Sequence, residues 1–252
     1  PRTLDSPVAQ FHATRMSNAT RPPGIPPEVK SAADTIVTEI RRLMANRTRP
    51  ILVALDGPSG AGKSTVALLV AEALGAALIQ SDDFFAADIS DAEWDTRTPE
   101  ARAADAIDWR RLRAEALDPL LAGKPAKWHA FDFEVSVRPD GTYAMRTDFV
   151  EREPAAVIVL DGAYSTRPEL ADLIDLSVLV DVPVGVRHAR LAAREDKDFL
   201  AAWHARWDAA EEYYFTEVRP KSSFDLVITT EQSPVAGKGE IPGRSAARSS
   251  IV

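Results

Sequence analysis

Residues 57–64 read GPSGAGKS and fit the pattern G-x-x-x-x-G-K-[ST], which is typical of a loop that binds phosphate groups. The glycines allow backbone N–H groups to curl around phosphate oxygens. The apolar run at 51–55 before the loop predicts a buried strand, and residues 65–74 after it have helical spacing of their apolar members. A strand, a glycine loop and a helix in this order predict a nucleoside triphosphate site at the helix N-terminus.

The residue types within this loop indicate separate roles. Lys63 is expected to reach the outer phosphates, and the Ser64 hydroxyl is expected to ligate Mg²⁺. ATP and Mg²⁺ are therefore the predicted cofactors. The predicted nucleotide-binding residues are Gly57, Ser59, Gly60, Ala61, Gly62, Lys63, Ser64 and Thr65. A chance match in a glycine-rich loop is the alternative, and the flanking strand and helix argue against it.

Composition narrows the class of protein. The chain has 252 residues, of which 45% are hydrophobic, and this suits one α/β domain with a full core. A formal net charge of −8 argues against a nucleic-acid partner, and no apolar run approaches the roughly 18 residues of a membrane helix. The chain has no cysteine, which excludes thiol chemistry and cysteine-bound metal. We expect a cytoplasmic protein without a nucleic-acid or membrane partner, and either a monomer or a homo-oligomer is compatible.

The chain divides into one domain and two tails. Residues 1–30 are rich in proline and show no period, and residues 231–252 are rich in Gly, Ser, Pro and Ala, so both are expected to be flexible. Between them, residues 31–230 are expected to form the folded domain that contains the phosphate loop. It should begin with a helix over 31–46, because apolar residues recur there at helical spacing.

Continuous apolar runs predict the strands of a parallel sheet covered by helices on both faces. These runs lie at 51–55, 78–81, 156–160, 176–180 and 226–229, and a further helix is expected over 114–121. The fold class is therefore α/β, a doubly wound parallel sheet of the P-loop NTPase type with flanking helices. A β-hairpin inserted between 131 and 152 is expected to have arms at 131–138 and 143–146 and its turn at 139–142.

Acidic residues follow two of the predicted strands. Asp82 and Asp83 come after the second strand, and Asp161 comes after the third. Ligands of parallel sheets bind beyond the carboxyl ends of the strands, so these carboxylates should face the phosphate loop. Asp82 is the candidate general base for an acceptor hydroxyl, with Asp83 as the open alternative. Ser64, Asp82 and Asp161 are the predicted metal ligands.

Positive charge over the transferring phosphate is expected from the segment 186–196. Arg187, Arg190 and Arg194 recur there at spacings of three and four, which places them on one helical face. Such a face could close as a helical lid and clamp a phosphate. A solvent-exposed helix with internal ion pairs is the alternative.

Together these features resemble the uridine kinase-like family of P-loop small-molecule kinases, which includes nicotinamide riboside kinases and is related to phosphoribulokinase. The resemblance covers about residues 50–230. It implies that Asp82 is the base, that Asp105 contacts the ribose hydroxyls, and that Phe131 lines the base pocket. It also implies that Arg190 and Arg194 are the lid arginines, so the predicted catalytic residues are Asp82, Lys63, Arg190 and Arg194. The predicted substrate-binding residues are accordingly Asp82, Asp105, Phe131 and Arg194.

Three positions depart from the family pattern. Phe131 stands where uridine kinases carry a tyrosine, and Ser136 stands near an expected histidine. Loss of such hydrogen-bonding groups reduces discrimination between bases. Asp161 replaces the usual glutamate, and its shorter side chain favours a water-bridged metal contact.

These observations predict an ATP-dependent transfer of the γ-phosphate to a hydroxyl of a small molecule, namely a nucleoside or another ribosyl compound. Two alternatives stay open at this point. One is a nucleotide-regulated ATPase or switch, although the chain lacks Asn-Lys-x-Asp and Leu-Ser-Gly-Gly motifs. The other is a kinase of a non-nucleoside acceptor such as a sugar or a pantothenate-like compound. GTP in place of ATP is not excluded by the sequence.

Overall fold

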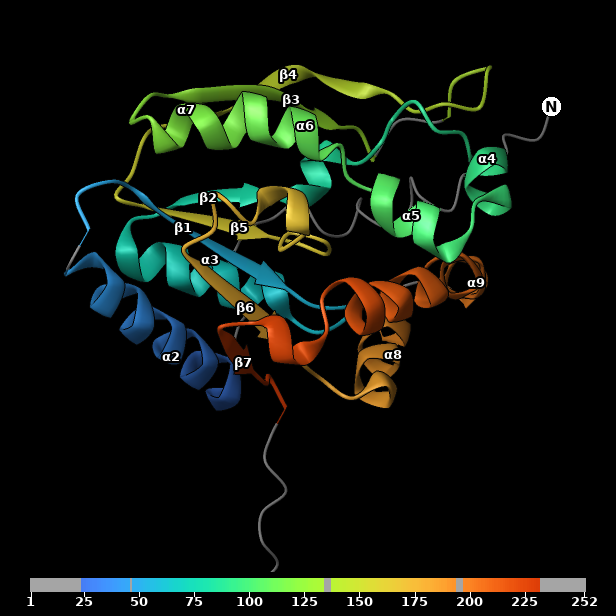
Figure 1. The fold of residues 1–252 in the computed structure, drawn as a ribbon. Helices are drawn as coiled ribbons and strands as arrows, with labels where there is room; N and C mark the ends of the chain where they lie inside the picture. The colour runs from blue at the N-terminus through green and yellow to red at the C-terminus, as the bar shows by residue number, and fades with distance from the viewer. Residues whose placement is uncertain (1–23, 46, 134–136, 194–196, 232–252) are drawn as a thin grey trace, which may run out of the picture.

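Five parallel strands form the centre of the protein, in a computed structural model that describes residues 24–45, 47–133, 137–193 and 197–231 (Figure 1). The strand order is β2-β5-β1-β6-β7. Their bounds are β1 Ile51–Asp56, β2 Ala77–Gln80, β5 Val157–Asp161, β6 Leu176–Val180 and β7 Leu226–Ile228. This confirms the predicted parallel α/β sheet. The predicted tails lie largely outside the described residues.

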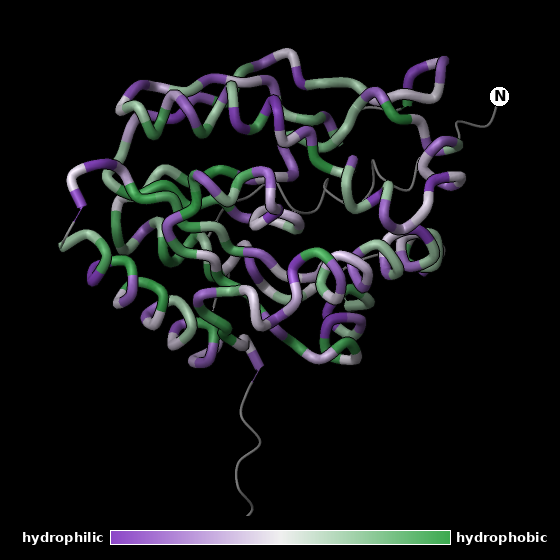
Figure 2. The backbone as a smooth tube through the Cα atoms, in the orientation of Figure 1, coloured by the Kyte–Doolittle hydropathy of each residue, from purple (hydrophilic) through white to green (hydrophobic). Residues whose placement is uncertain are grey.

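Alternate residues of β1 point into two separate cores. Ile51, Val53 and Leu55 pack under helices α2 (Pro27–Met44) and α3 (Lys63–Leu74). Leu52 and Ala54 face the opposite core, which contains Trp128 and Trp207. Every residue of β1 is buried because helices or the hairpin cover both faces of the sheet. Figure 2 shows the most hydrophobic stretches of the chain at this centre.

The remaining helical elements surround the carboxyl ends of the strands and the second core (Figure 1). Helix α2 begins at Pro27, four residues before the predicted start, because proline suits the first turn of a helix. None of the helices in the described ranges has the length and apolar character needed to cross a membrane. The other elements are η1 Ser81–Phe84, α4 Asp91–Thr96, α5 Pro99–Asp105, α6 Trp109–Arg111, η2 Leu112–Leu117, α7 Asp118–Leu121, η3 Pro168–Leu170, α8 Val184–Ala192, α9 Lys197–Tyr213, η4 Tyr214–Val218 and η5 Lys221–Ser223.

The inserted hairpin exists, but its arms differ from the prediction. Strands β3 (Ala126–Phe131) and β4 (Met145–Arg152) pair antiparallel, from Ala126 opposite Arg152 to Phe131 opposite Met145. The arms predicted at 131–138 and 143–146 were therefore wrong in register. Burial in β3 alternates from Ala126 to Ala130, so the packing face begins five residues before the predicted strand. A tight turn does lie near 139–142, where the Gly141 N–H donates to the Arg138 carbonyl over 2.8 Å.

A buried carboxylate ties the end of β1 to two distant segments. Asp56 is fully buried, and its Oδ1 accepts the N–H groups of Gly57 and Tyr164 at 2.8 and 3.0 Å. Its Oδ2 accepts the N–H and hydroxyl of Thr166 at 2.9 and 2.7 Å and the Tyr214 hydroxyl at 2.9 Å. Asp56 thereby fixes the start of the phosphate loop against the segment that follows β5.

We predict that Asp56→Asn lowers the free energy of unfolding by about 3 kcal/mol, because an amide NH₂ would face donors where an acceptor is required. Urea unfolding followed by circular dichroism measures this change. The control is Asp34→Asn on the exposed face of α2, which should change stability by less than about 0.5 kcal/mol. Equal stability of the two variants would contradict the role of Asp56.

Candidate active site

The carboxyl ends of three neighbouring strands bring the predicted site residues together. Asp161, the last residue of β5, pairs with Leu55 of β1 on one side and with Gln80 of β2 on the other. The phosphate loop starts two residues after Leu55, and Asp82 follows two residues after Gln80. Asp161 therefore lies between the phosphate loop and Asp82, as expected for adjacent ends of a parallel sheet.

Gly162 makes this close approach possible. Its φ is +143°, and a Cβ at this position would lie 1.8 Å from the Ser81 hydroxyl oxygen and 3.5 Å from Asp82 Oδ1. Only glycine fits such a backbone and such a gap. The Asp82 carboxylate therefore lies against the end of β5, next to the buried Asp161.

Five consecutive carbonyl oxygens of the phosphate loop accept hydrogen bonds from side chains. Lys63 Nζ donates to Gly57 and Pro58 at 2.6 and 3.1 Å. The Ser59 carbonyl accepts Arg187 at 3.1 Å, and the Gly60 and Ala61 carbonyls accept Arg190 at 3.4 and 3.1 Å. With its carbonyl groups held in this way, the loop can direct N–H groups toward an anion, as phosphate-binding nests do.

Helices α8 and α9 supply the side chains that fasten the loop from outside. Arg187 and Arg190 both belong to α8, and their contacts with the loop confirm that they share one face. From α9, Glu211 Oε1 accepts the N–H and hydroxyl of Ser59 at 2.9 and 2.5 Å, and its Oε2 lies 3.4 Å from Arg187. Thr230, after β7, donates to the Ala61 carbonyl at 2.7 Å. The segment predicted as a lid therefore contacts the phosphate loop directly.

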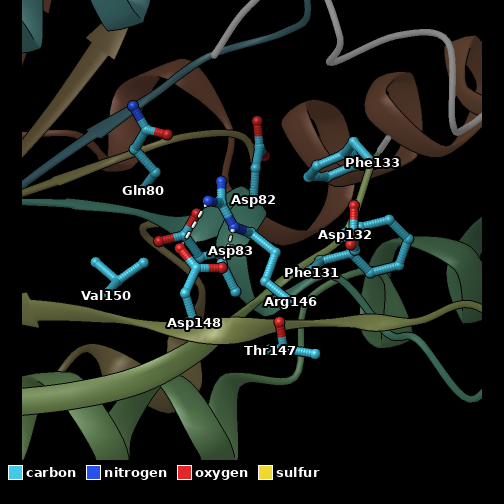
Figure 3. A pocket seen from close by; sticks show the side chains of 11 residues that line it. Gln80, Asp82, Asp83, Phe131, Asp132, Phe133, Arg146, Thr147, Asp148 and Val150 are labelled. Carbon is cyan, nitrogen blue, oxygen red and sulfur yellow. Dashed lines mark hydrogen bonds and ion pairs between the residues drawn. The ribbon is translucent and has the colours of Figure 1, made fainter. Parts of the chain in front are cut away.

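A pocket of about 250 Å³ lies between the end of β2 and the hairpin (Figure 3). Asp82 lines this pocket and also lies against the end of β5, so the pocket suits an acceptor. Phe131 lines it and packs against Phe85, Phe133 and Tyr143 at ring-centroid distances of 5.1, 4.4 and 5.2 Å. The lining residues are Gln80, Asp82, Asp83, Ala130, Phe131, Asp132, Phe133, Arg146, Thr147, Asp148 and Val150.

The two adjacent aspartates of this pocket differ in their surroundings. Asp83 is buried, and its Oδ2 accepts the indole N–H of Trp128 at 2.9 Å. Burial raises the pKa of Asp83 to about 6, with a smaller contribution from Asp82, while the hydrogen bond from Trp128 opposes the increase. Asp82 is half-buried and points away from Asp83 in Figure 3. Asp82 is thus the more accessible of these two carboxylates.

Three residues singled out in the sequence lie away from the acceptor pocket or outside the described residues. Asp105, at the end of α5, is exposed and forms an ion pair with Arg97, and it is not among the residues that line the pocket. Arg194 and Ser136 lie outside the described residues. The contact of Asp105 with a ribose therefore stays a prediction.

Sequence reasoning missed several side chains that shape the site. Asp56 and Glu211 hold the phosphate loop through contacts with residues more than 100 positions away, and no spacing in the sequence indicates such contacts. Arg146 and Asp148 on β4 form a bidentate pair at 3.0 and 2.7 Å inside the pocket. The wrong register of the hairpin concealed this pair, because it placed the second arm before Thr147.

We predict that Asp83→Asn becomes progressively more stable than the unmodified protein as pH rises from 4 to 7. A folded pKa of about 6, above the ordinary 3.8, means that the native state holds this proton more tightly than the unfolded chain. The unmodified protein has this additional stability below about pH 4 and loses it as the pH rises through 6. The asparagine variant does not titrate in this range, so its stability does not change in this way. The difference in unfolding free energy should grow by up to about 3 kcal/mol in denaturant titrations. A difference that is constant over this range would contradict the raised pKa.

Comparisons with known proteins agree with this geometry. The family model for cytidylate kinase matches residues 53–89, which run from β1 through the phosphate loop to the segment after η1. A uridine kinase of Deinococcus deserti is 30% identical over 160 residues, covering 62% of this chain and 73% of the relative. A uridine kinase of Streptococcus uberis is 28% identical over 178 residues, covering 69% and 79%.

Solved structures show the same fold. The structure of a possible uridine kinase from Bacillus stearothermophilus superposes with a TM-score of 0.59 at 20% identity and covers 80% of this chain and 99% of that chain. The matched sequences, the matched fold and the converging strand ends lead to one conclusion. The chain belongs to the uridine kinase family, and it is a small-molecule kinase with a phosphate-loop fold.

Proposed function

We propose that this kinase transfers the γ-phosphate of ATP, with Mg²⁺, to a hydroxyl of a nucleoside or a similar ribosyl compound. The observation that carries the proposal is Asp82: it lines the acceptor pocket and also lies against the end of β5, beside the phosphate loop. One carboxylate thus faces both the acceptor side and the donor side. The relatives named uridine kinase support the nucleoside class. A cytoplasmic location stays a prediction from the sequence, and both a monomer and a homo-oligomer stay compatible with it.

The donor half of the site fits a nucleoside triphosphate. The loop N–H groups and Lys63 would hold the outer phosphates, and Lys63 would exchange its contacts with the Gly57 and Pro58 carbonyls for phosphate oxygens. Ser64, Asp82 and Asp161 offer one hydroxyl and two carboxylates, and oxygen ligands of this kind suit Mg²⁺. When bound, Mg²⁺ would neutralise negative charge on the phosphates.

On the acceptor side, Asp82 would take the proton of the attacking hydroxyl. The hydroxyl oxygen then forms a bond to the γ-phosphorus while the bond from that phosphorus to the bridging oxygen breaks, and ADP leaves with the bonding electrons. Arg190 would stabilise the charge of the transferred group, and for this it would have to exchange its contacts with the Gly60 and Ala61 carbonyls for phosphate oxygens. Arg194 is proposed for the same role.

The charge of the pocket limits which charge an acceptor molecule can carry. Four carboxylates line it, from Asp82, Asp83, Asp132 and Asp148, against a single guanidinium, that of Arg146, which is paired with Asp148. Such a lining disfavours an acceptor that already carries a phosphate or carboxylate. It favours a neutral or cationic molecule with several hydroxyl donors. A nucleoside and a simple sugar meet this condition, whereas a pantothenate-like acid does not.

We predict that Asp82→Asn lowers kcat at least about 100-fold, since a general base contributes to the chemical step, and leaves the Kd for ATP without Mg²⁺ within about threefold. A coupled ADP-release assay with uridine and cytidine, together with equilibrium ATP binding, measures both quantities. Asp83→Asn is the matched control, because it removes the neighbouring carboxylate and leaves Asp82 in place. Near-normal turnover of Asp82→Asn would refute its assignment as the base.

We also predict that kcat/KM is at least about 100-fold higher for uridine and cytidine than for orotidine, which keeps every ribose hydroxyl but carries a carboxylate, because the carboxylates of the pocket repel the added charge. The same assay measures the ratio for each pair. Asp148→Asn should narrow the ratio, since it removes a charged partner of Arg146. A kcat/KM for orotidine that equals those for uridine and cytidine would exclude the proposed acceptor class.

A further inference from the structure

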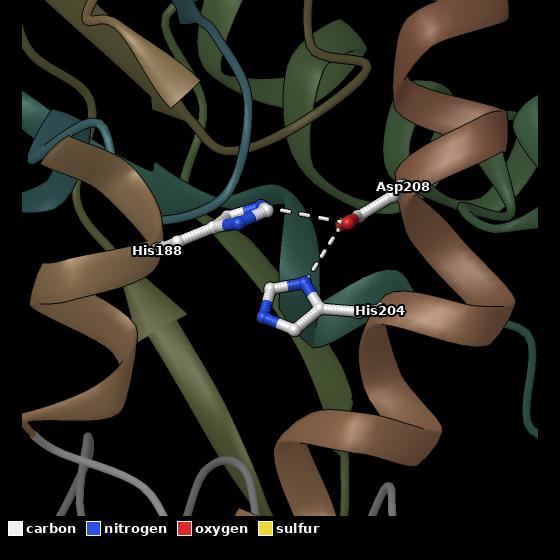
Figure 4. A group of neighbouring side chains, drawn as sticks. All are labelled: His188, His204 and Asp208. Atoms are coloured by element: carbon white, nitrogen blue, oxygen red, sulfur yellow. Dashed lines mark hydrogen bonds and ion pairs between the residues drawn. The ribbon is translucent and has the colours of Figure 1, made fainter. Parts of the chain in front are cut away.

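Two histidines and an aspartate meet between helices α8 and α9, away from the acceptor pocket (Figure 4). His188 lies on α8, and His204 and Asp208 lie one turn apart on α9. Both rings turn toward the same carboxylate, with His188 Nε2 at 3.4 Å from Asp208 Oδ2 and His204 Nδ1 at 2.9 Å from Asp208 Oδ1. Among the described residues, this is the one such group of at least three potential metal ligands.

The spacing of the donor atoms suits a metal ion. Ligand atoms about 2.0–2.1 Å from a tetrahedral ion lie about 3.3 Å apart. The distances from the two histidines to the Asp208 carboxylate, 3.4 Å to Oδ2 and 2.9 Å to Oδ1, are close to this value. All three donor atoms lie within 4.8 Å of one another, so the histidine nitrogens need to approach by at most about 1.5 Å. Rotation of two half-exposed rings can supply that movement.

The environment of His188 also favours a role as a metal ligand. Its Nε2 atom is buried and has no hydrogen-bond partner, although it points at a carboxylate. Buried polar atoms are normally hydrogen-bonded, so this nitrogen is suited to another kind of partner. The side chains of the three residues are 38%, 26% and 39% exposed, which leaves a route from solvent for an ion.

We propose that His188, His204 and Asp208 form a binding site for a divalent transition-metal ion of the zinc class, with a fourth position open to water. Two imidazole nitrogens and one carboxylate oxygen are the donors that such ions prefer, whereas Mg²⁺ prefers oxygen ligands alone. This site is therefore chemically distinct from the Mg²⁺ position proposed beside the phosphate loop.

The site would connect the two helices that fasten the phosphate loop. His188 follows Arg187, which binds the Ser59 carbonyl, and Asp208 lies one turn before Glu211, which binds the Ser59 N–H. An ion held by both helices fixes their mutual position and hence the two contacts with Ser59. The bound metal thus stabilises the arrangement of α8 and α9 around the phosphate loop.

The first test titrates Co²⁺ and then Zn²⁺ into the full chain after chelator treatment, without nucleotide. We expect saturation at one ion per chain, visible Co²⁺ absorption of the tetrahedral type, and its displacement by Zn²⁺. His204→Ala and Asp208→Asn should each weaken binding at least about tenfold. His129→Ala, which removes a histidine on β3, is the matched control and should bind as the unmodified protein does. Equal binding by all variants, or no saturable binding, would overturn the proposal.

A second variant gives a positive signal that does not depend on loss of binding. His188→Cys places a thiol at the position of a proposed ligand, and ions of the zinc class bind cysteine sulfur. The chain has no cysteine of its own, so this thiol is the only one present. Co²⁺ should then produce a thiolate-to-metal charge-transfer band, and the additional change His204→Ala should reduce its affinity at least about tenfold. Absence of the band in a folded His188→Cys protein would overturn the site. Neither test depends on kinase activity, so their outcome is independent of the proposed function.

Discussion

The donor half of this enzyme depends on how the phosphate loop is held from outside. Five successive carbonyl oxygens, from Gly57 to Ala61, accept hydrogen bonds from Lys63, Arg187, Arg190 and Thr230. Peptide groups have their N–H opposite their carbonyl, so fixing one side fixes the other. The loop sequence supplies the flexibility for this shape, and long-range contacts supply the rigidity.

The same contacts relate the phosphate loop to the rest of the chain. Asp56 anchors the loop where it leaves β1, and Glu211 anchors Ser59 from α9. Both carboxylates lie close to a site for an anion, yet their oxygens are occupied by N–H and hydroxyl donors. Their negative charge is used within the protein, and this leaves the concave side of the loop for the nucleotide. The acceptor pocket differs from the phosphate loop in its charge, since most of the charged groups that line the pocket are carboxylates.

Sequence patterns sufficed where neighbouring residues control the structure. The apolar run of β1, the glycine loop and the helix α3 follow one another within 24 residues, from Ile51 to Leu74, and their order was predicted correctly. The approach of Asp82 and Asp161 also followed from the sequence, because parallel strands end at the same edge. The hairpin was placed in the wrong register, since alternation within β3 begins before the aromatic segment at Phe131.

By itself, the sequence determined the fold class, the position of the phosphate loop and the strand ends that carry acidic residues. These follow from local spacing and from the geometry of a parallel sheet. The tertiary structure alone decided that Asp83 is buried beside Trp128, that Glu211 reaches Ser59, and that His188 meets Asp208. Each of these contacts joins residues that are far apart in the chain or on separate helices. Their pairing depends on how whole elements pack, which residue spacing does not encode.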